Sequence, residues 1–123
     1  MRKLVIITAM LVSQSAFAFH DFTGTYKCTG HDPYLNRDYH GTVTISQQNT
    51  VYKILMKYNT GEEYDATGGQ YSDDLLSVVF QDKNNLKIVG LEQYRYDEKY
   101  NAMGGFWVYL GKDKIGTETC KKE

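Results

Sequence analysis

The feature that most constrains the fold is a series of short, strand-like segments separated by turn-forming residues at nearly even spacing. The stretches between them are rich in Gly, Asn and Asp, which tolerate turn conformations or hydrogen-bond to their own backbone. No stretch of helical length shows a 3.6-residue period, and the only proline, Pro33, falls in the first connection, where it interrupts no ladder. The chain is therefore expected to be all-β. The spacing predicts strands over residues 22–29, 39–48, 51–58, 63–70, 75–81, 86–96, 103–110 and 114–121.

Alternation within these segments assigns an inward face to each strand. Tyr26 and Cys28 share the inward face of the first segment, and Trp107 and Tyr109 share that of the seventh. The opposite face of the seventh segment is also apolar, so either an inverted assignment or a covered outer face stays open at this point. In both cases the predicted core is rich in aromatic side chains.

The first eighteen residues have the pattern of a cleavable export signal. Arg2 and Lys3 precede an apolar run over residues 4–12, and residues 16–18 form an A-x-A cleavage site. The run is shorter than the roughly 20 residues that a membrane-spanning helix needs. We expect cleavage after position 18, which leaves residues 19–123 as a single domain in the periplasm or outside the cell.

The charge balance argues against two classes of partner. Removal of the signal takes away Arg2 and Lys3, which leaves 12 basic against 15 acidic residues and a formal charge of −3. A mildly acidic chain without a basic stripe lacks the electrostatic footprint for nucleic acid or for an anionic membrane surface. We therefore expect no nucleic-acid partner, and no later segment is apolar enough to predict a membrane span.

Cys28 and Cys120 are the only cysteines, and they lie near the two ends of the predicted domain. In an oxidising compartment, one disulfide is their expected state. An even number of up-and-down strands makes the first and last antiparallel, and a bridge between directly opposite cysteines would place Gly30 opposite Glu118. The sequence therefore predicts a single antiparallel up-and-down barrel of about eight strands, closed by the disulfide. An open sandwich would need long crossovers, and only the first connection is long enough for one.

The stretches FTGTYKC near the start and GFWVYLGKDKIGTETC near the end carry a family resemblance, together with the hairpin-linked strands between them. The chain resembles the calycin group of small exported β-barrels, in particular its avidin-like and lipocalin-like members. This resemblance implies a barrel with one open end and an internal ligand site. Trp107 is the only tryptophan, so the residues that enclose biotin in avidins are missing, and Gly24-Thr25-Tyr26 replaces the GxW signature of lipocalins. The fold is carried over from the family, and biotin binding is not.

Alternation also places carboxylates inside such a barrel. An inward Cys120 turns Glu118 inward, and the sixth segment faces inward either with Glu92 and Tyr94 or with the apolar positions between them. No Lys or Arg joins the first of these faces, so buried carboxylates would need tyrosine hydroxyls, a shared proton or a cation. We therefore predict a small polar or cationic organic ligand, held by Glu92 or Glu118 between aromatic walls. The predicted ligand-binding residues are Tyr26, Tyr52, Tyr64, Glu92, Tyr94, Trp107, Tyr109 and Glu118.

Two other interpretations stay open. A barrel of this size can be filled by its own side chains, with the glutamates near its rim. The chain can also be an adhesin or inhibitor that binds an extracytoplasmic protein through exposed tyrosines, which suit recognition surfaces. The tyrosines outside the predicted strand cores are Tyr34, Tyr39, Tyr71 and Tyr100.

The sequence predicts neither catalysis nor a cofactor. It contains no nucleophile elbow, HExxH motif or Gly-rich phosphate loop. Four potential metal ligands, His31, Asp32, Asp38 and His40, would meet only if the first loop folded back, and their spacing matches no metal motif. We expect a non-catalytic protein without a bound metal.

Overall fold

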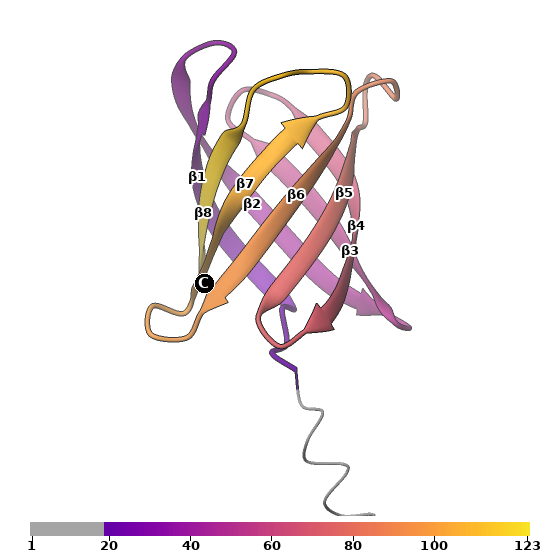
Figure 1. The fold of residues 1–123 in the computed structure, drawn as a ribbon, viewed down its shortest axis with the longest axis vertical. Coiled ribbons are helices and arrows are strands. Elements are labelled where there is room, and N and C mark those ends of the chain that lie inside the picture. The colour runs from indigo at the N-terminus through magenta and orange to yellow at the C-terminus, as the bar shows by residue number, and fades with distance from the viewer. Residues whose placement is uncertain (1–18) are drawn as a thin grey trace, which may run out of the picture.

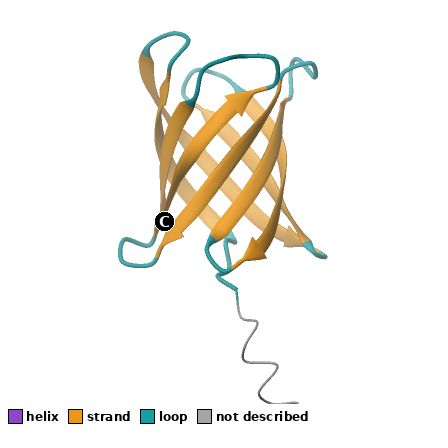
Figure 2. Cartoon of the chain, in the orientation of Figure 1, coloured by secondary structure: helices purple, strands orange, loops and turns teal. Residues whose placement is uncertain are grey.

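The computed structural model describes residues 19–123, so the predicted export signal lies outside the described residues. These residues form eight antiparallel strands that close into an up-and-down barrel, with β8 paired to β1 (Figure 1). Loops alone join the strands (Figure 2). The strands are β1 (Gly24–Asp32), β2 (Arg37–Gln48), β3 (Val51–Tyr58), β4 (Glu63–Ser72), β5 (Leu75–Asp82), β6 (Val89–Asp97), β7 (Ala102–Tyr109) and β8 (Gly116–Lys122). The predicted fold class is confirmed.

The first connection is a tight hairpin and not a crossover. β1 continues to Asp32 and β2 begins at Arg37, so the loop predicted between them contributes to both strands. The Asp32 carboxylate accepts the backbone N–H groups of Tyr34 and Leu35, and Asn36 adopts a positive φ of 48°. This Asx-type turn ends the strand, and it removes the long connection that an open sandwich would require.

Several predicted strand ends are wrong, because local turns replace the ladder. β1 begins at Gly24, so Phe22 lies before the strand, and β8 begins at Gly116. β6 begins at Val89, because the Asp82 carboxylate accepts the backbone N–H groups of Asn84 and Asn85 and starts a turn. Residues 86–88, predicted as strand, belong to this connection.

The closure between β1 and β8 has the predicted register. Cys28 pairs with Cys120, Gly30 with Glu118 and Tyr26 with Lys122. The two cysteines form a disulfide across this pair, and they are 92 residues apart in sequence. The bridge therefore joins the first strand to the last, and it fixes Glu118 on the inside of the barrel.

The predicted inward faces are confirmed by burial. Phe22, Tyr26, Met103 and Trp107 are buried, whereas Phe106 on the other face of β7 is exposed. The assignment of β7 is therefore not inverted. On β6 the face that carries Glu92 and Tyr94 is buried and Leu91 is exposed, which resolves the ambiguity left by the sequence.

The two ends of the barrel differ. The N-terminal residues close the end that carries the β2–β3, β4–β5 and β6–β7 turns. There the His20 ring stacks on Tyr96 at a centroid distance of 3.4 Å, Phe22 is fully buried, and Tyr26 donates a hydrogen bond to the Phe22 carbonyl. We call this the closed end, and the opposite end, with the other four turns, the mouth.

The close pairing of β6 and β7 gives a first prediction. A methyl group added at Gly105 would overlap the carbonyl group of Gln93 on the neighbouring strand, whereas at Gly104 its nearest contacts are 3.8 Å away. Gly105→Ala is expected to lower the free energy of unfolding by about 1 to 3 kcal/mol, because the sheet must open to admit the side chain. Urea denaturation of this variant and of Gly104→Ala measures the difference; equal stabilities would contradict the described pairing.

The described residues contain no helix that is long and apolar enough to cross a membrane.

Candidate functional site

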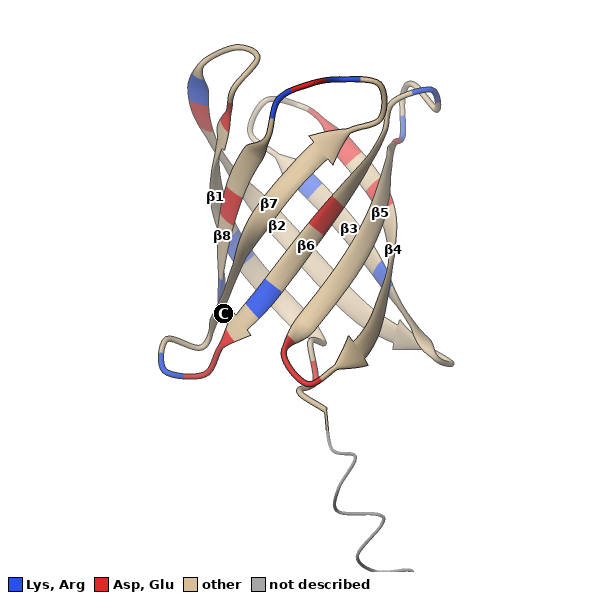
Figure 3. Cartoon of the chain, viewed as in Figure 1, with Lys and Arg blue, Asp and Glu red and all other residues tan. Residues whose placement is uncertain are grey.

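Three charged side chains are buried among the described residues: Asp82, Glu92 and Glu118, with exposures of 7%, 2% and 2%. The Asp82 carboxylate is occupied by the turn that follows β5. The other two belong to β6 and β8 and lie in the barrel interior. Figure 3 shows acidic positions on both of these strands. Buried carboxylates are costly unless they are paired or hydrogen-bonded, so the partners of these two groups decide what the interior can do.

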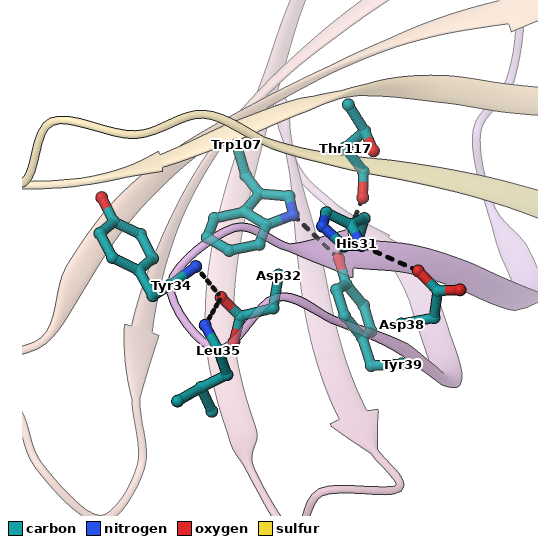
Figure 4. A network of polar contacts seen from close by, with 8 residues as sticks. All are labelled: His31, Asp32, Tyr34, Leu35, Asp38, Tyr39, Trp107 and Thr117. Carbon is teal, nitrogen blue, oxygen red and sulfur yellow. Dashed lines mark hydrogen bonds and ion pairs between the residues drawn. The ribbon is translucent and has the colours of Figure 1, made fainter.

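Glu118 is fully hydrogen-bonded by tyrosines from three strands. Its Oε1 accepts hydrogen bonds from the hydroxyls of Tyr39 at 2.8 Å and Tyr58 at 3.0 Å, and its Oε2 accepts one from Tyr94 at 2.7 Å. The indole N–H of Trp107 donates to the Tyr39 hydroxyl at 2.9 Å and so orients it (Figure 4). This network explains how an acidic group is accommodated on β8, and it leaves Glu118 little capacity for a further ligand.

Glu92 has a different environment. Its Oε2 is buried and has no hydrogen-bond partner among the described residues. No Lys or Arg is buried beside it; among the described residues the buried charged groups are all acidic. A buried polar atom without a partner is rare in native proteins and commonly marks a site where something else binds.

Burial and the neighbouring carboxylate make the ionisation of Glu92 unfavourable. Burial, and then the charge of Glu118, hold the pKa of Glu92 well above its ordinary value of 4.5. Burial also raises the pKa of Glu118, but the hydrogen bonds from Tyr94, Tyr39 and Tyr58 oppose that shift. On acidification Glu92 therefore takes up a proton before Glu118 does.

A pocket lies between these groups and the mouth, with a free volume of about 40 Å³. A cavity needs ~10 to 15 Å³ to admit one water molecule, so this pocket has room for a small group. Four carboxylates and a single guanidinium, that of Arg37, line it. The lining residues are Asp32, Arg37, Tyr39, Met56, Tyr58, Thr60, Glu62, Tyr64, Phe80, Glu92, Trp107, Tyr109 and Glu118.

The mouth is shaped by its turns. Tyr34, on the β1–β2 hairpin, accepts a hydrogen bond from the backbone N–H of Lys114 at 2.9 Å, and its ring lies 6.0 Å from that of Tyr109. Glu62 accepts a hydrogen bond from the Tyr64 hydroxyl at 2.7 Å. The contacts of Tyr34 hold the β1–β2 hairpin against β7 and the β7–β8 loop.

The structure brings most of the predicted site together. Tyr64, Glu92, Trp107, Tyr109 and Glu118 line the pocket, and Tyr94 supports it through Glu118. The remaining two predicted residues, Tyr26 and Tyr52, do not line it: Tyr26 bonds to the Phe22 carbonyl and Tyr52 to the Gln70 side chain at the closed end. Alternation predicts which face of a strand a residue lies on, but it does not predict the position of that residue along the barrel axis.

Two of the tyrosines that donate hydrogen bonds to Glu118 are not among the predicted ligand-binding residues. Alternation within residues 51–58 predicts that Tyr58 faces inward, but nothing in the sequence connects it to Glu118. Tyr39 was assigned to an exposed recognition surface, yet it packs against the core and bonds to Glu118. A strand that begins at Arg37 assigns Tyr39 to the inward face, because Tyr39 then alternates in step with the inward Val43.

Apart from Asp32, the remaining sequence candidates fall outside the pocket. Tyr71 and Tyr100 are exposed, at 81% and 57%, as the protein-recognition interpretation requires, whereas Tyr34 is half-buried. His31 and Asp38 pair at 2.8 Å across the β1–β2 hairpin, but Asp32 is turned to the backbone of its own turn (Figure 4). The four potential metal ligands are thus divided between separate contacts.

The unpaired carboxylate gives a second prediction, on pH dependence. Because the pKa of Glu92 is raised on folding, the native state binds more protons than the unfolded state above pH 4.5, and stability falls as the pH rises from there toward the native pKa. Glu92→Gln removes this penalty. It should therefore stabilise the ligand-free protein by about 1 to 3 kcal/mol near pH 8 and have a small effect near pH 4.

Denaturant titration of refolded protein at both pH values measures this effect. Glu98→Gln is the matched control, since Glu98 is exposed in the β6–β7 turn and loses the same charge. A Glu92 variant that is less stable than the parent near pH 8 would contradict a raised pKa.

Comparison with known proteins supports the fold. A redesigned β-barrel, mFAP1, bound to DFHBI, matches with a TM-score of 0.64 and 17% identity over 81% of this chain and 94% of that one. A second redesigned β-barrel matches with a TM-score of 0.67 and 10% identity over 82% and 90% of the two chains. A de novo designed fluorescence-activating β-barrel matches with a TM-score of 0.61 and 11% identity over 83% and 94%. At such identities these likenesses concern the fold alone.

No model of a known protein family matches the chain, and no curated protein matches it.

Proposed function

We propose that this protein is an exported, non-catalytic binding protein that holds a small polar or cationic ligand in the mouth pocket. The observation that carries the proposal is the buried Oε2 of Glu92, which has no partner among the described residues. A ligand that donates a hydrogen bond or a positive charge to this oxygen would complete the site. Such a ligand would also lower the pKa of Glu92, because it stabilises the ionised carboxylate.

The charge of the pocket supports a cation over an anion. Asp32, Glu62, Glu92 and Glu118 line it, and Arg37 is the one basic residue among the lining side chains. Arg37 is exposed at the mouth, so its charge is screened by solvent, whereas Glu92 and Glu118 are buried. An anionic ligand would have to approach two carboxylates at low dielectric.

The neighbouring structures support a ligand site in a barrel of this architecture. mFAP1 is a redesigned β-barrel bound to the small molecule DFHBI. The free volume of about 40 Å³ here is small, so the proposed ligand inserts only a compact group and leaves its remainder in the mouth.

Features of the chain itself support a non-catalytic function outside the cytoplasm. No catalytic motif accompanies the two glutamates, and three tyrosines already occupy the oxygens of Glu118, so it is a poor proton acceptor for a substrate. The A-x-A pattern at residues 16–18 and the Cys28–Cys120 disulfide both suit an oxidising compartment.

A thermal-shift screen tests the proposal. Small cations, neutral polar compounds and anions are added to the purified protein, to Glu92→Gln and to Glu98→Gln. A ligand that binds the native pocket raises the thermal unfolding midpoint of the parent and of Glu98→Gln. It does not raise the midpoint of Glu92→Gln, because that variant lacks the carboxylate contact. Equal responses of all three proteins, or stabilisation by anions alone, would contradict the proposal.

A second candidate function is that of a protein-interaction module, favoured by exposed apolar side chains on the outer face of β5, β6 and β7. Val79 pairs with Leu91 across β5 and β6, and Phe106 lies on the same outer face of β7; all three are exposed. Exposed apolar side chains on neighbouring strands suit a protein contact. Crosslinking in the native source should then capture a partner that Leu91→Lys no longer binds, and an unchanged pattern in that variant would reject this surface.

A further inference from the structure

We propose that the pocket selects a primary ammonium group, which binds Glu92 in exchange for the carboxyl proton. This inference rests on the proposed function, and it narrows the ligand class from small polar or cationic compounds to amines that keep N–H donors. It also makes binding dependent on pH.

The requirement for N–H donors follows from the hydrogen bonds of the two carboxylates. Both oxygens of Glu118 are occupied by tyrosine hydroxyls, and its Oε2 also lies 3.3 Å from the Cys120 sulfur. The vacant acceptor in the interior is the Oε2 of Glu92. A primary ammonium supplies three donors, whereas a quaternary ammonium carries the same charge and no donor, so only the first satisfies this oxygen.

Size leads to the same conclusion. The free volume of about 40 Å³ accepts a group of the size of a few water molecules. An ammonium head is close to a water molecule in size, while three methyl groups on the nitrogen would have to displace aromatic walls. Those walls are packed against each other: Phe80 lies 5.2 Å from Tyr64 and 5.9 Å from Tyr109 between ring centroids.

The aromatic walls also favour a cation. The rings of Trp107 and Tyr109 are 5.2 Å apart between centroids and both line the pocket beside Glu92. A desolvated ammonium near such rings gains cation–π attraction in addition to its contact with the carboxylate. The thin alkyl part of the amine then extends toward the mouth.

The proton exchange follows from the groups that surround Glu92. Within residues 19–123, Glu118 on β8 is the one buried charged group that faces Glu92. Neutral hydroxyls come from β2, β3, β4, β6 and β7, on Tyr39, Tyr58, Tyr64, Tyr94 and Tyr109. Phe80 on β5 and Trp107 on β7 carry no charge, and Asp32, Glu62 and Arg37 lie at the mouth.

With two acids and no buried base, the empty pocket keeps a proton on Glu92. When the ammonium binds, the O–H bond of Glu92 breaks and the proton goes to solvent. The carboxylate that remains pairs with the ammonium, which keeps all three of its own N–H bonds. The total charge is conserved, and affinity must fall as the pH is lowered.

Isothermal titration with n-butylammonium and n-butyltrimethylammonium tests the inference, since the two probes share a tail and a charge and differ in N–H donors. Titrations at several pH values between about 5 and 8, each in two buffers of different ionisation enthalpy, count the protons released. We expect n-butylammonium to bind at least about tenfold more tightly, to release close to one proton, and to bind more tightly as the pH rises. Binding should be lost in Glu92→Gln and retained in Glu98→Gln.

Other results would overturn the inference. A quaternary probe that binds as tightly as the primary amine would remove the donor requirement, and binding without proton release would remove the exchange. If neither probe binds while another compound of the thermal-shift screen acts through Glu92, the amine specificity fails and the proposed function stands. If no compound acts through Glu92, both fail.

Discussion

Replacement of both cysteines, Cys28→Ala together with Cys120→Ala, is expected to lower the free energy of unfolding by about 4 to 5 kcal/mol. The bridge closes a loop of 92 residues, so its loss restores a large chain entropy to the unfolded state. In a domain of this size such a loss is a large part of the total stability. Denaturant titration of the oxidised parent and of the double variant measures it.

The matched control for the disulfide is the neighbouring pair Thr29 and Thr119, which face each other across the same two strands and are exposed. Thr29→Ala with Thr119→Ala should cost little, because no buried contact is removed. A disulfide-free variant that lost no more stability than this control would contradict the role of the bridge in closing the barrel. Two alkylatable thiols in the non-reduced parent would have the same consequence.

Glu118→Ala is expected to destabilise the protein by about 3 to 5 kcal/mol, although it removes a buried acid. The hydroxyls of Tyr39, Tyr58 and Tyr94 would lose their acceptor, and the shortened side chain would leave a cavity. Each buried donor left without a partner costs about 1 to 3 kcal/mol. The loss should be visible in urea denaturation and in thermal unfolding.

Two companions sharpen the Glu118 result. Glu118→Gln keeps one acceptor oxygen and should lose less than Glu118→Ala, while Thr119→Ala on the same strand should be nearly neutral. A Glu118→Ala variant as stable as the parent would contradict the role of the tyrosine network in accommodating the carboxylate.

The two glutamates thus have opposite expected effects on stability. Glu118 accepts hydrogen bonds at both of its oxygens and supports the fold, whereas Glu92 has a buried oxygen without a partner among the described residues and costs stability near neutral pH. A residue that weakens the fold in this way is typical of a binding site, because function is maintained at the expense of stability. This contrast is the main reason for placing the ligand contact at Glu92.

Much of the fold followed from local rules in the sequence. Turn residues located eight strands, alternation assigned the faces of several of them but left those of β6 and β7 open, and the cysteines set the register between the first and last strands. The strand ends were less well predicted where a side chain caps a turn. Asp32 and Asp82 determine the ends of β1 and β5 through hydrogen bonds that depend on three-dimensional geometry.

The site was only partly predictable. Alternation from Cys120 placed Glu118 inside the barrel, but it left two possible inward faces for the strand that carries Glu92. Tyr26 and Tyr52 were grouped with these glutamates although they lie near the closed end. The level of a residue along the barrel depends on the stagger between strands, which alternation does not determine. Tyr39 and Glu118 are 79 residues apart in sequence, so their hydrogen bond forms only when the barrel closes.

Native mass spectrometry of the protein isolated from its own source tests the central claim most directly. If Glu92 holds a ligand, the parent should carry a bound small molecule with a basic nitrogen, and Glu92→Gln produced in the same source should be free of it while Glu98→Gln retains it. A parent without any bound molecule, or the same molecule on all three proteins, would contradict a ligand site at Glu92.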